Sequence, residues 1–212
     1  QTTSDKQVLN LGPFEVRFDE NRPFFIEGTD LFRIGNVFYS RRIGATPHNY
    51  YDAIDGVGAN ETLTSSPIAS PLINGSKVSG RTKKGLGIGV FNSVEGRTSA
   101  SIMDSNGVER LVLTNPLTNY NVFVLSQNLK NNSTVSFVNT NVTREGNARN
   151  ANVSVGQANL FSQSGKFKVS STVRASNVNE EEEVKNGHSF TAKFAKVSGL
   201  IQYDLGYWKE SE

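Results

Sequence analysis

Hydrophobic and polar residues alternate with a period of two along most of the chain after residue 76. In residues 77 to 82 and 86 to 90, apolar or small residues take every second position, and Lys83-Lys84-Gly85 separates the two stretches. This pattern predicts two strands joined by a tight turn. Similar stretches recur at 97–103, 108–114, 118–127, 134–144, 150–156, 157–163, 166–175, 189–196 and 200–208. Since no stretch has a helical period, about ten strands in hairpin order predict an all-β fold, an antiparallel up-and-down meander.

A meander of this length must protect its two edge strands, and closing into a barrel removes the edges altogether. A tilted strand of about nine to eleven residues is long enough to cross a bilayer. One face of the predicted strands is apolar, and the other carries small or polar residues that suit either a wet lumen or bulk water. A soluble β-sandwich has the same alternation, so periodicity leaves a membrane barrel and a sandwich both open.

The stretch from Phe14 to Gly44 is the part of the chain richest in aromatic residues and paired charges. It is interpreted either as an aromatic core capped by arginines or as an inward-packed plug or collar, because a barrel interior is polar enough to hold charge pairs. We predict that one charged network holds this stretch in place as a structural motif. Its members are Arg17, Arg22, Glu27, Asp30, Arg41 and Arg42.

Residues 45 to 76 are predicted to form a long loop, because they hold three of the chain's six prolines together with several glycines and serines. His48, Tyr50 and Tyr51 lie in this loop. Adjacent tyrosines in a polar loop can stack on a flat ligand, and they can equally pack on the scaffold beneath them. We therefore name these three residues as a possible ligand-contact loop.

The composition excludes several classes of function. The net charge is +2 and charged residues make up 20% of the chain, which does not match the basic footprint of a nucleic-acid-binding protein. There is no cysteine and there are two histidines, so disulfides, thiolate zinc sites and histidine-rich metal clusters are excluded. The chain has no signal-peptide pattern and no apolar run long enough for a transmembrane helix. We expect no metal, no cofactor and no catalytic residue.

The chain resembles a family of large outer-membrane proteins of Gram-negative bacteria of the Bacteroides or Flavobacterium type. In that family a family-9-like carbohydrate-binding module precedes a domain of unknown function that is thought to be a β-barrel. The likeness lies in VLNLGPFEVRFDENRPFFIEGTDLF and FYSRRIG, and it continues through KVSGRTKKGLGIGVFNSV, PLTNYNVFVLSQNLKNNSTVSFVNTNV and HSFTAKFAKVSGLIQYDLGYW. No carbohydrate module precedes Gln1 and no terminal aromatic strand closes the chain, so it resembles an internal fragment of such a protein.

The resemblance implies one domain that forms part of a transmembrane outer-membrane β-barrel. Residues 1–44 are then the entry segment, 45–76 the loop and 77–212 the barrel strands. It implies a binding or transport-associated role, with a link to carbohydrate uptake or processing, and outer-membrane lipid, a glycan or other outer-membrane proteins as partners. Two alternatives stay open: a glycoside-hydrolase-associated enzyme and a soluble β-sandwich interaction module. A hydrolase needs two carboxylates across a cleft, and the clustered acids Glu20, Glu27 and Asp30 each have an arginine nearby, which favours structural ion pairs.

Overall fold

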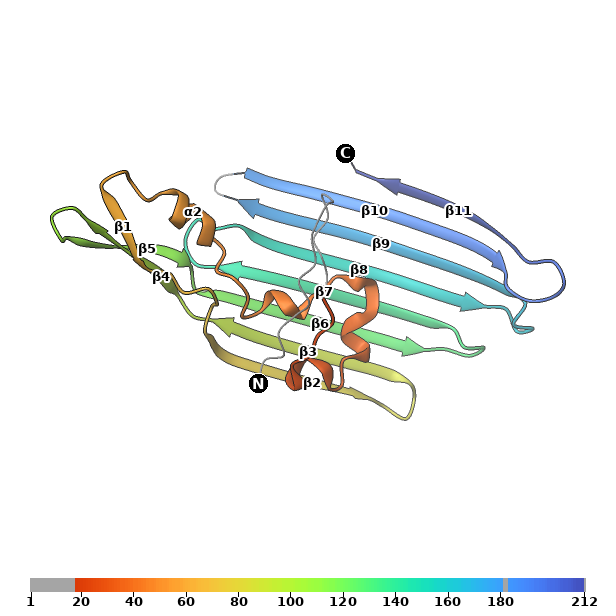
Figure 1. Cartoon of the computed structure of the whole chain (residues 1–212). Helices are drawn as coiled ribbons and strands as arrows, with labels where there is room; N and C mark the ends of the chain where they lie inside the picture. The colour runs from red at the N-terminus through yellow and green to blue at the C-terminus, as the bar shows by residue number, and fades with distance from the viewer. Residues whose placement is uncertain (1–17, 181–182, 212) are drawn as a thin grey trace.

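The computed structural model describes residues 18–180 and 183–211, and it confirms the all-β antiparallel prediction. Two sheets make up the fold (Figure 1). The large sheet has eight strands in the order β11-β10-β9-β8-β7-β6-β3-β2, and the small sheet has three in the order β1-β4-β5. Every strand pair is antiparallel. Among the described residues, no helix is long and apolar enough to span a membrane.

The elements follow one another in hairpin order, with short helices at the start. The helical elements are α1 (Pro23–Ile26), the 3-10 helices η1 (Asp30–Asn36) and η2 (Ser40–Arg42), and α2 (Tyr50–Asp55). The strands are β1 (Glu61–Ser65), β2 (Leu72–Arg81), β3 (Leu86–Glu95), β4 (Thr98–Asp104), β5 (Glu109–Asn115), β6 (Thr118–Asn128), β7 (Thr134–Arg144), β8 (Asn150–Phe161), β9 (Phe167–Glu180), β10 (Glu183–Lys196) and β11 (Tyr203–Glu210).

The meander is interrupted once, which alternation did not predict. The hairpin β4–β5 leaves the large sheet and pairs with β1, so that β3 and β6 become direct neighbours. Pro116 stands between β5 and β6 and has no N–H for a ladder hydrogen bond. The predicted long loop also contains α2, β1 and the first residues of β2. The stretches 150–156 and 157–163, predicted as two strands, form one strand that passes straight through Gly156.

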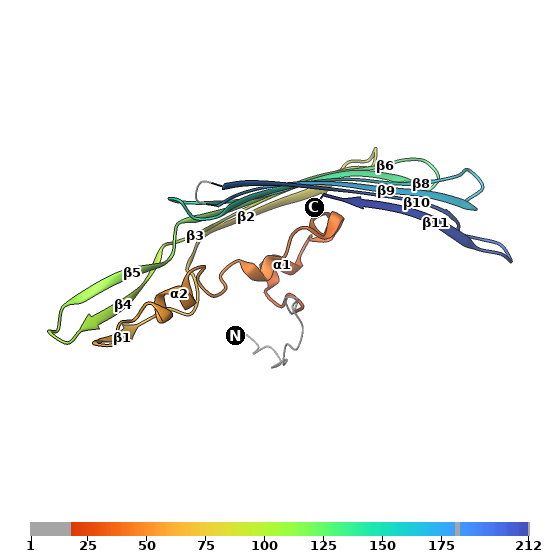
Figure 2. The same ribbon diagram turned by 90° about the horizontal axis from the view of Figure 1, so that it is seen from above.

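Residues 18–44 lie on one face of the large sheet (Figure 2). Phe91 of β3 is 2% exposed at the centre of this contact, and the rings of four phenylalanines surround it at centroid distances of 5.1 to 6.3 Å: Phe24, Phe25, Phe32 and Phe38. Gly87 and Gly89 point to the same face. A Cβ on Gly87 would lie 2.9 Å from Leu31, and one on Gly89 would lie 3.1 Å from Phe32. The two glycines therefore let the segment approach the sheet closely.

The opposite face of the large sheet exposes an apolar band. Side chains alternate between the two faces along each strand, and the register of neighbouring strands places all members of the band on this face. They are Val78, Ile88, Val90, Phe123, Val135, Phe137, Leu160, Phe167, Val169, Val173, Phe190, Phe194, Tyr203, Leu205 and Tyr207, each at least 36% exposed. Nothing in the described part of the chain covers this band. A contiguous apolar surface across a whole sheet marks an interaction surface.

One row of asparagines borders the apolar band. Asn92, Asn121, Asn141, Asn152, Asn177 and Asn186 pair in register from β3 to β10, one on each of six adjacent strands. Amide hydrogen bonds link several of them across the strands: Asn92 donates to Asn121 at 2.8 Å and Asn177 donates to Asn186 at 2.8 Å. At the other end of the band lie the hairpin turns with Lys83, Lys84, Lys130 and Lys166. The face is thus apolar in the middle and polar at both ends.

Candidate functional site

Arg22 is the centre of the charged network in residues 18–44. Its guanidinium donates to the Glu20 carboxylate at 2.8 and 2.9 Å, to the Ser40 carbonyl at 2.9 Å and to the Ile43 carbonyl at 2.6 Å. It also lies 4.1 Å from the centroid of the Phe25 ring. Because one side chain joins the start of the segment to residues 40–43, it fixes the loop that brings Phe25 and Ile43 into the core.

The other predicted members of the network have different surroundings. The acid that pairs with Arg22 is Glu20, whereas the side chains of Glu27 and Asp30 are exposed and form no ion pair with any described residue. Arg41 lies 5.9 Å from the Phe18 ring centroid, and both Arg41 and Arg42 make further interactions within the molecule. Arg17 lies outside the described residues. Among the described residues, Glu27 and Asp30 therefore lie outside the ion pair that Arg22 forms.

Glu20 also bears on the hydrolase alternative. Burial by itself would raise the pKa of this carboxyl, but hydrogen bonds from Arg22 and Ser40 outweigh that effect and lower the pKa to about 2. A general acid of a glycosidase needs a raised pKa. Glu20 is ionised at neutral pH and serves as the counter-ion of Arg22.

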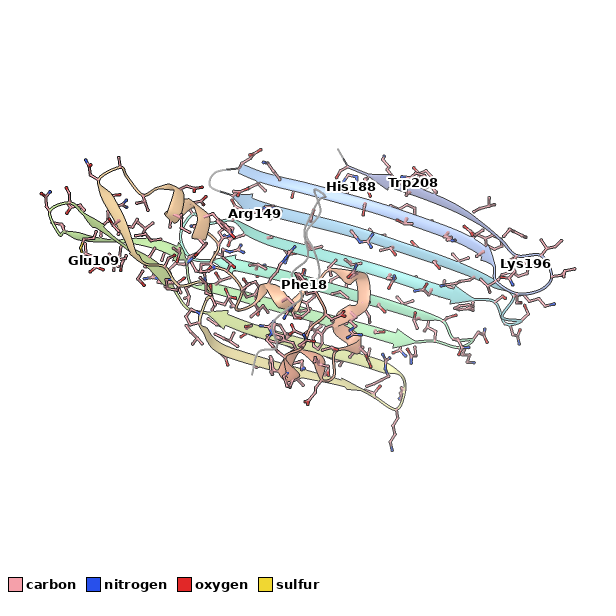
Figure 3. The ribbon with its side chains drawn as sticks, in the orientation of Figure 1. Phe18, Glu109, Arg149, His188, Lys196 and Trp208 are labelled. Atoms are coloured by element: carbon pink, nitrogen blue, oxygen red, sulfur yellow. The ribbon has the colours of Figure 1, made fainter. Side chains whose placement is uncertain are left out.

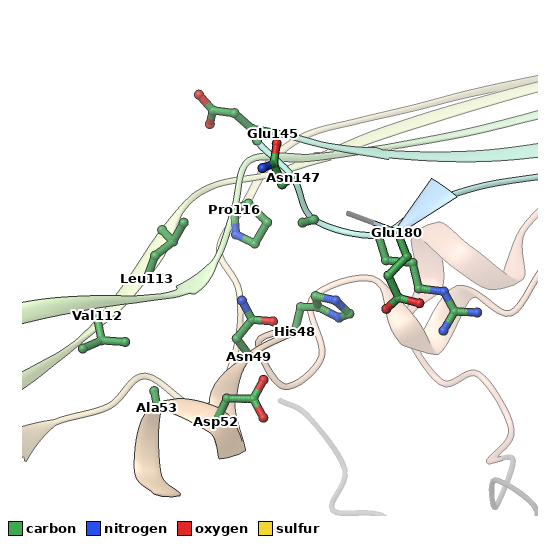
Figure 4. Close-up of a pocket in the computed structure, with 13 residues that line it drawn as sticks. His48, Asn49, Asp52, Ala53, Val112, Leu113, Pro116, Glu145, Asn147 and Glu180 are labelled. Carbon is green, nitrogen blue, oxygen red and sulfur yellow. The ribbon is translucent and has the colours of Figure 1, made fainter. Parts of the chain in front are cut away.

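A crevice lies where the two sheets meet, and it consists of two adjoining cavities of about 710 and 440 Å³. His48 and Arg149 line both. Figure 4 shows the larger cavity, with His48 and Asp52 on one side and Pro116 and Asn147 on the other. The walls come from the segment before α2, the β5–β6 connection and the β7–β8 turn. Segments that are far apart in the sequence therefore meet at this end of the large sheet.

The predicted ligand-contact residues separate in the structure. His48 lines the crevice, and its backbone N–H donates to the Asn115 side-chain oxygen at 3.2 Å. Tyr50 and Tyr51 belong to α2, where their rings pack edge to face at 5.2 Å, and neither lines the two cavities. Tyr51 is 70% exposed. Of the three, only His48 has the position that a ligand in the crevice would need.

Glu95 and the β7–β8 turn complete the wall, and sequence reasoning missed both. Glu95 is 2% exposed, and its carboxylate accepts from the Gly44 N–H at 2.5 Å, the Tyr120 hydroxyl at 3.4 Å and the Asn115 amide at 3.5 Å. The contact with Gly44 ties residues 18–44 to the end of β3. A single glutamate at a strand end gives no signal in the sequence, because its burial depends on chain segments that fold over it.

The Arg144 end of β7 is held by contacts on both sides of the turn. The Arg144 N–H donates to the Asn150 side chain at 2.5 Å, and its guanidinium donates to the Arg149 carbonyl. Glu145 binds Arg97 through its carboxylate, and its N–H donates to the Leu117 carbonyl at 3.0 Å. The turn therefore presents its arginines from a fixed backbone.

Comparison with known proteins gives one result. Neither the curated proteins nor the solved structures contain a match to this chain. One family model matches residues 1–212, the full length of the sequence. The chain therefore belongs to the family described as Domain of unknown function (DUF5916).

Proposed function

We propose that this chain forms part of the wall of an outer-membrane β-barrel with a binding or transport-associated role, its apolar band facing lipid and residues 18–44 inside. The observation that carries the proposal is the division of the large sheet into two unlike faces. One face packs against residues 18–44 and continues as a polar surface over β9 and β10. The other carries the apolar band between the asparagine row and the lysine-bearing turns.

The dimensions of the band suit a bilayer. From Asn177 to Phe167 the strand rises about 34 Å at roughly 3.4 Å per residue. A tilt of about 40° reduces this to a height of about 26 Å, and the lipid-facing band of membrane barrels is about 25 Å tall. Amides and lysines at its two ends are the groups expected in the interfacial regions, where water and headgroups can bind them.

The inner face has the character of a barrel interior beyond the area that residues 18–44 cover. Lys168, Arg174 and Lys193 project from it on β9 and β10, and Lys193 pairs with Asp204 of β11 at 2.9 Å. Interiors of outer-membrane barrels are polar and hold such charges. The exposed edges of β2 and β11 do not pair with each other among the described strands. In the proposal, further strands complete the wall at these edges, since open strand edges do not occur in lipid.

Fractionation of the full-length native protein tests this function. We expect it to sediment with the outer membrane, to resist extraction by high salt and to require detergent for release. On a gel run in detergent without boiling it should migrate faster than after boiling, as a folded barrel does. Recovery in the soluble fraction without detergent, with one mobility before and after boiling, would contradict the proposal and favour a sheet that packs against another protein layer.

A further inference from the structure

We propose that the crevice between the two sheets binds the oxyanion group of a small molecule, a carboxylate or a phosphate, between Arg144, Arg149 and His48. The site lies beyond the asparagine row, outside the apolar band, and so on the aqueous side of the proposed membrane. Figure 3 shows Arg149 at this end of the large sheet, next to the small sheet.

The first argument is an excess of arginines over acids in the smaller of the two cavities. Arg42, Arg144 and Arg149 line the smaller cavity together with His48, and the acid among its lining residues is Glu95. Glu95 is buried and already accepts three hydrogen bonds from Gly44, Tyr120 and Asn115. Burial raises the pKa of the Glu95 carboxyl, and the charge of Arg144 acts in the opposite direction.

Three acids line the larger cavity, Asp52, Glu145 and Glu180, so the excess of positive charge lies in the smaller cavity. Glu145 is bound to Arg97. Asp52 and Glu180 line the cavity, and neither forms an ion pair with a described residue. Arg42 already makes other interactions within the molecule. The guanidinium of Arg149, by contrast, has no hydrogen-bond or ion-pair partner in the described part of the chain.

The second argument is the effect of these cations on His48. Partial burial lowers the pKa of His48, and the charges of Arg144 and Arg149 lower it further, while Asp52 and Glu180 act weakly in the opposite direction. His48 is therefore uncharged at neutral pH in the empty protein. An anion bound beside the two arginines would oppose their effect and let His48 take up a proton more readily, so His48 reports on anion binding.

The third argument is geometric. A guanidinium offers paired N–H donors that match the two oxygens of a carboxylate or phosphate. Arg144 and Arg149 flank one turn, and hydrogen bonds of the backbone at this turn fix the position from which both side chains extend. The two adjoining cavities, at about 440 and 710 Å³, are within the range of small-molecule sites.

The test is an NMR titration of the two histidines in the full chain at low ionic strength, with inorganic phosphate and acetate as separate probes. His48 reports on the crevice, and His188 on β10 is an internal control. We expect phosphate, acetate or both to raise the pKa of His48 and to leave His188 unchanged. A response to phosphate alone identifies a phosphate-type site, and a response to acetate alone a carboxylate site.

Two arginine variants make the outcome specific. Arg149→Gln should weaken binding of the responding probe by roughly fivefold or more, and in the absence of any probe it should raise the pKa of His48, because a neighbouring cation is lost. Arg33→Gln, at an exposed arginine outside the crevice, should do neither. The inference is overturned if neither probe moves His48, if His188 moves equally, or if chloride at the same ionic strength gives the same change. These results are independent of membrane fractionation, so this site and the proposed barrel can fail separately.

Discussion

Replacing Phe91 with Ala is expected to lower the free energy of unfolding by about 3–5 kcal/mol, the usual cost of truncating a buried phenylalanine. Phe91 is 2% exposed and stands among four other phenylalanine rings. Because those rings belong to residues 18–44, the cavity would loosen the segment as well as the sheet. Denaturant unfolding measures the loss of stability, and the rate of tryptic cleavage after Arg41 and Arg42 measures how far residues 18–44 loosen.

Phe123→Ala is the matched control for this variant. Phe123 lies on the neighbouring strand β6, where it pairs with Val90. Its side chain projects from the other face of the sheet and is 39% exposed. Because the Phe123 side chain is exposed and does not contact residues 18–44, its truncation should cost less than about 1.5 kcal/mol and leave cleavage at residues 41 and 42 unchanged. If the two alanine variants lose the same stability, residues 18–44 do not depend on the Phe91 contact and the described core is wrong.

Replacing Val173 with Arg is expected to reduce the amount of folded protein in the membrane. Val173 lies near the middle of the apolar band, opposite Phe190 of β10. An arginine on the lipid face at the bilayer midplane costs about 2–4 kcal/mol. The Val173→Arg variant should therefore show a reduced folded fraction in the outer membrane, measured as the loss of the faster-migrating unboiled form.

Thr172→Arg places the same charge one residue away on the other face of the sheet. Thr172 pairs with Thr191 and shares its face with Arg174, Lys193 and other polar residues. Water can solvate an arginine there, so the cost should be below about 1 kcal/mol. Equal losses in the two variants would contradict the assignment of the faces, and a greater loss in Thr172→Arg would reverse it.

Most strands after residue 76 were predictable from the sequence, because hydrophobic and polar residues alternate with a period of two in them. Which strands pair with each other was less predictable. The departure of β4 and β5 from the large sheet depends on β1, and β1 lies in a stretch whose prolines predicted a loop. The asparagine row was also hidden. Each asparagine is an ordinary polar residue in its own strand, and the row exists only when the hairpin turns set the register of six strands.

The pairing of the charged residues was also hard to predict from the sequence. Aromatic and arginine density singled out the stretch from Phe14 to Gly44, of which the described residues 18–44 pack on the sheet. The acid that pairs with Arg22 is two residues before it in the chain, whereas the predicted Glu27 and Asp30 are exposed. Among the predicted loop residues, His48 reaches the crevice and the tyrosines do not. Arg149 lines the same two cavities but lies in a distant turn, so no local pattern could have joined it to His48.

Cysteine accessibility on β9 and β10 tests the central claim most directly, because the chain has no cysteine of its own. Single cysteines would replace Val169, Val173 or Phe190 on the apolar face and Ser170, Thr172 or Thr191 on the polar face, in the full-length protein in isolated outer membranes. A membrane-impermeant maleimide should label the second set and should label the first only after detergent is added. Equal labelling of both sets before detergent would show that the apolar band faces water or protein rather than lipid, and the membrane account would fail.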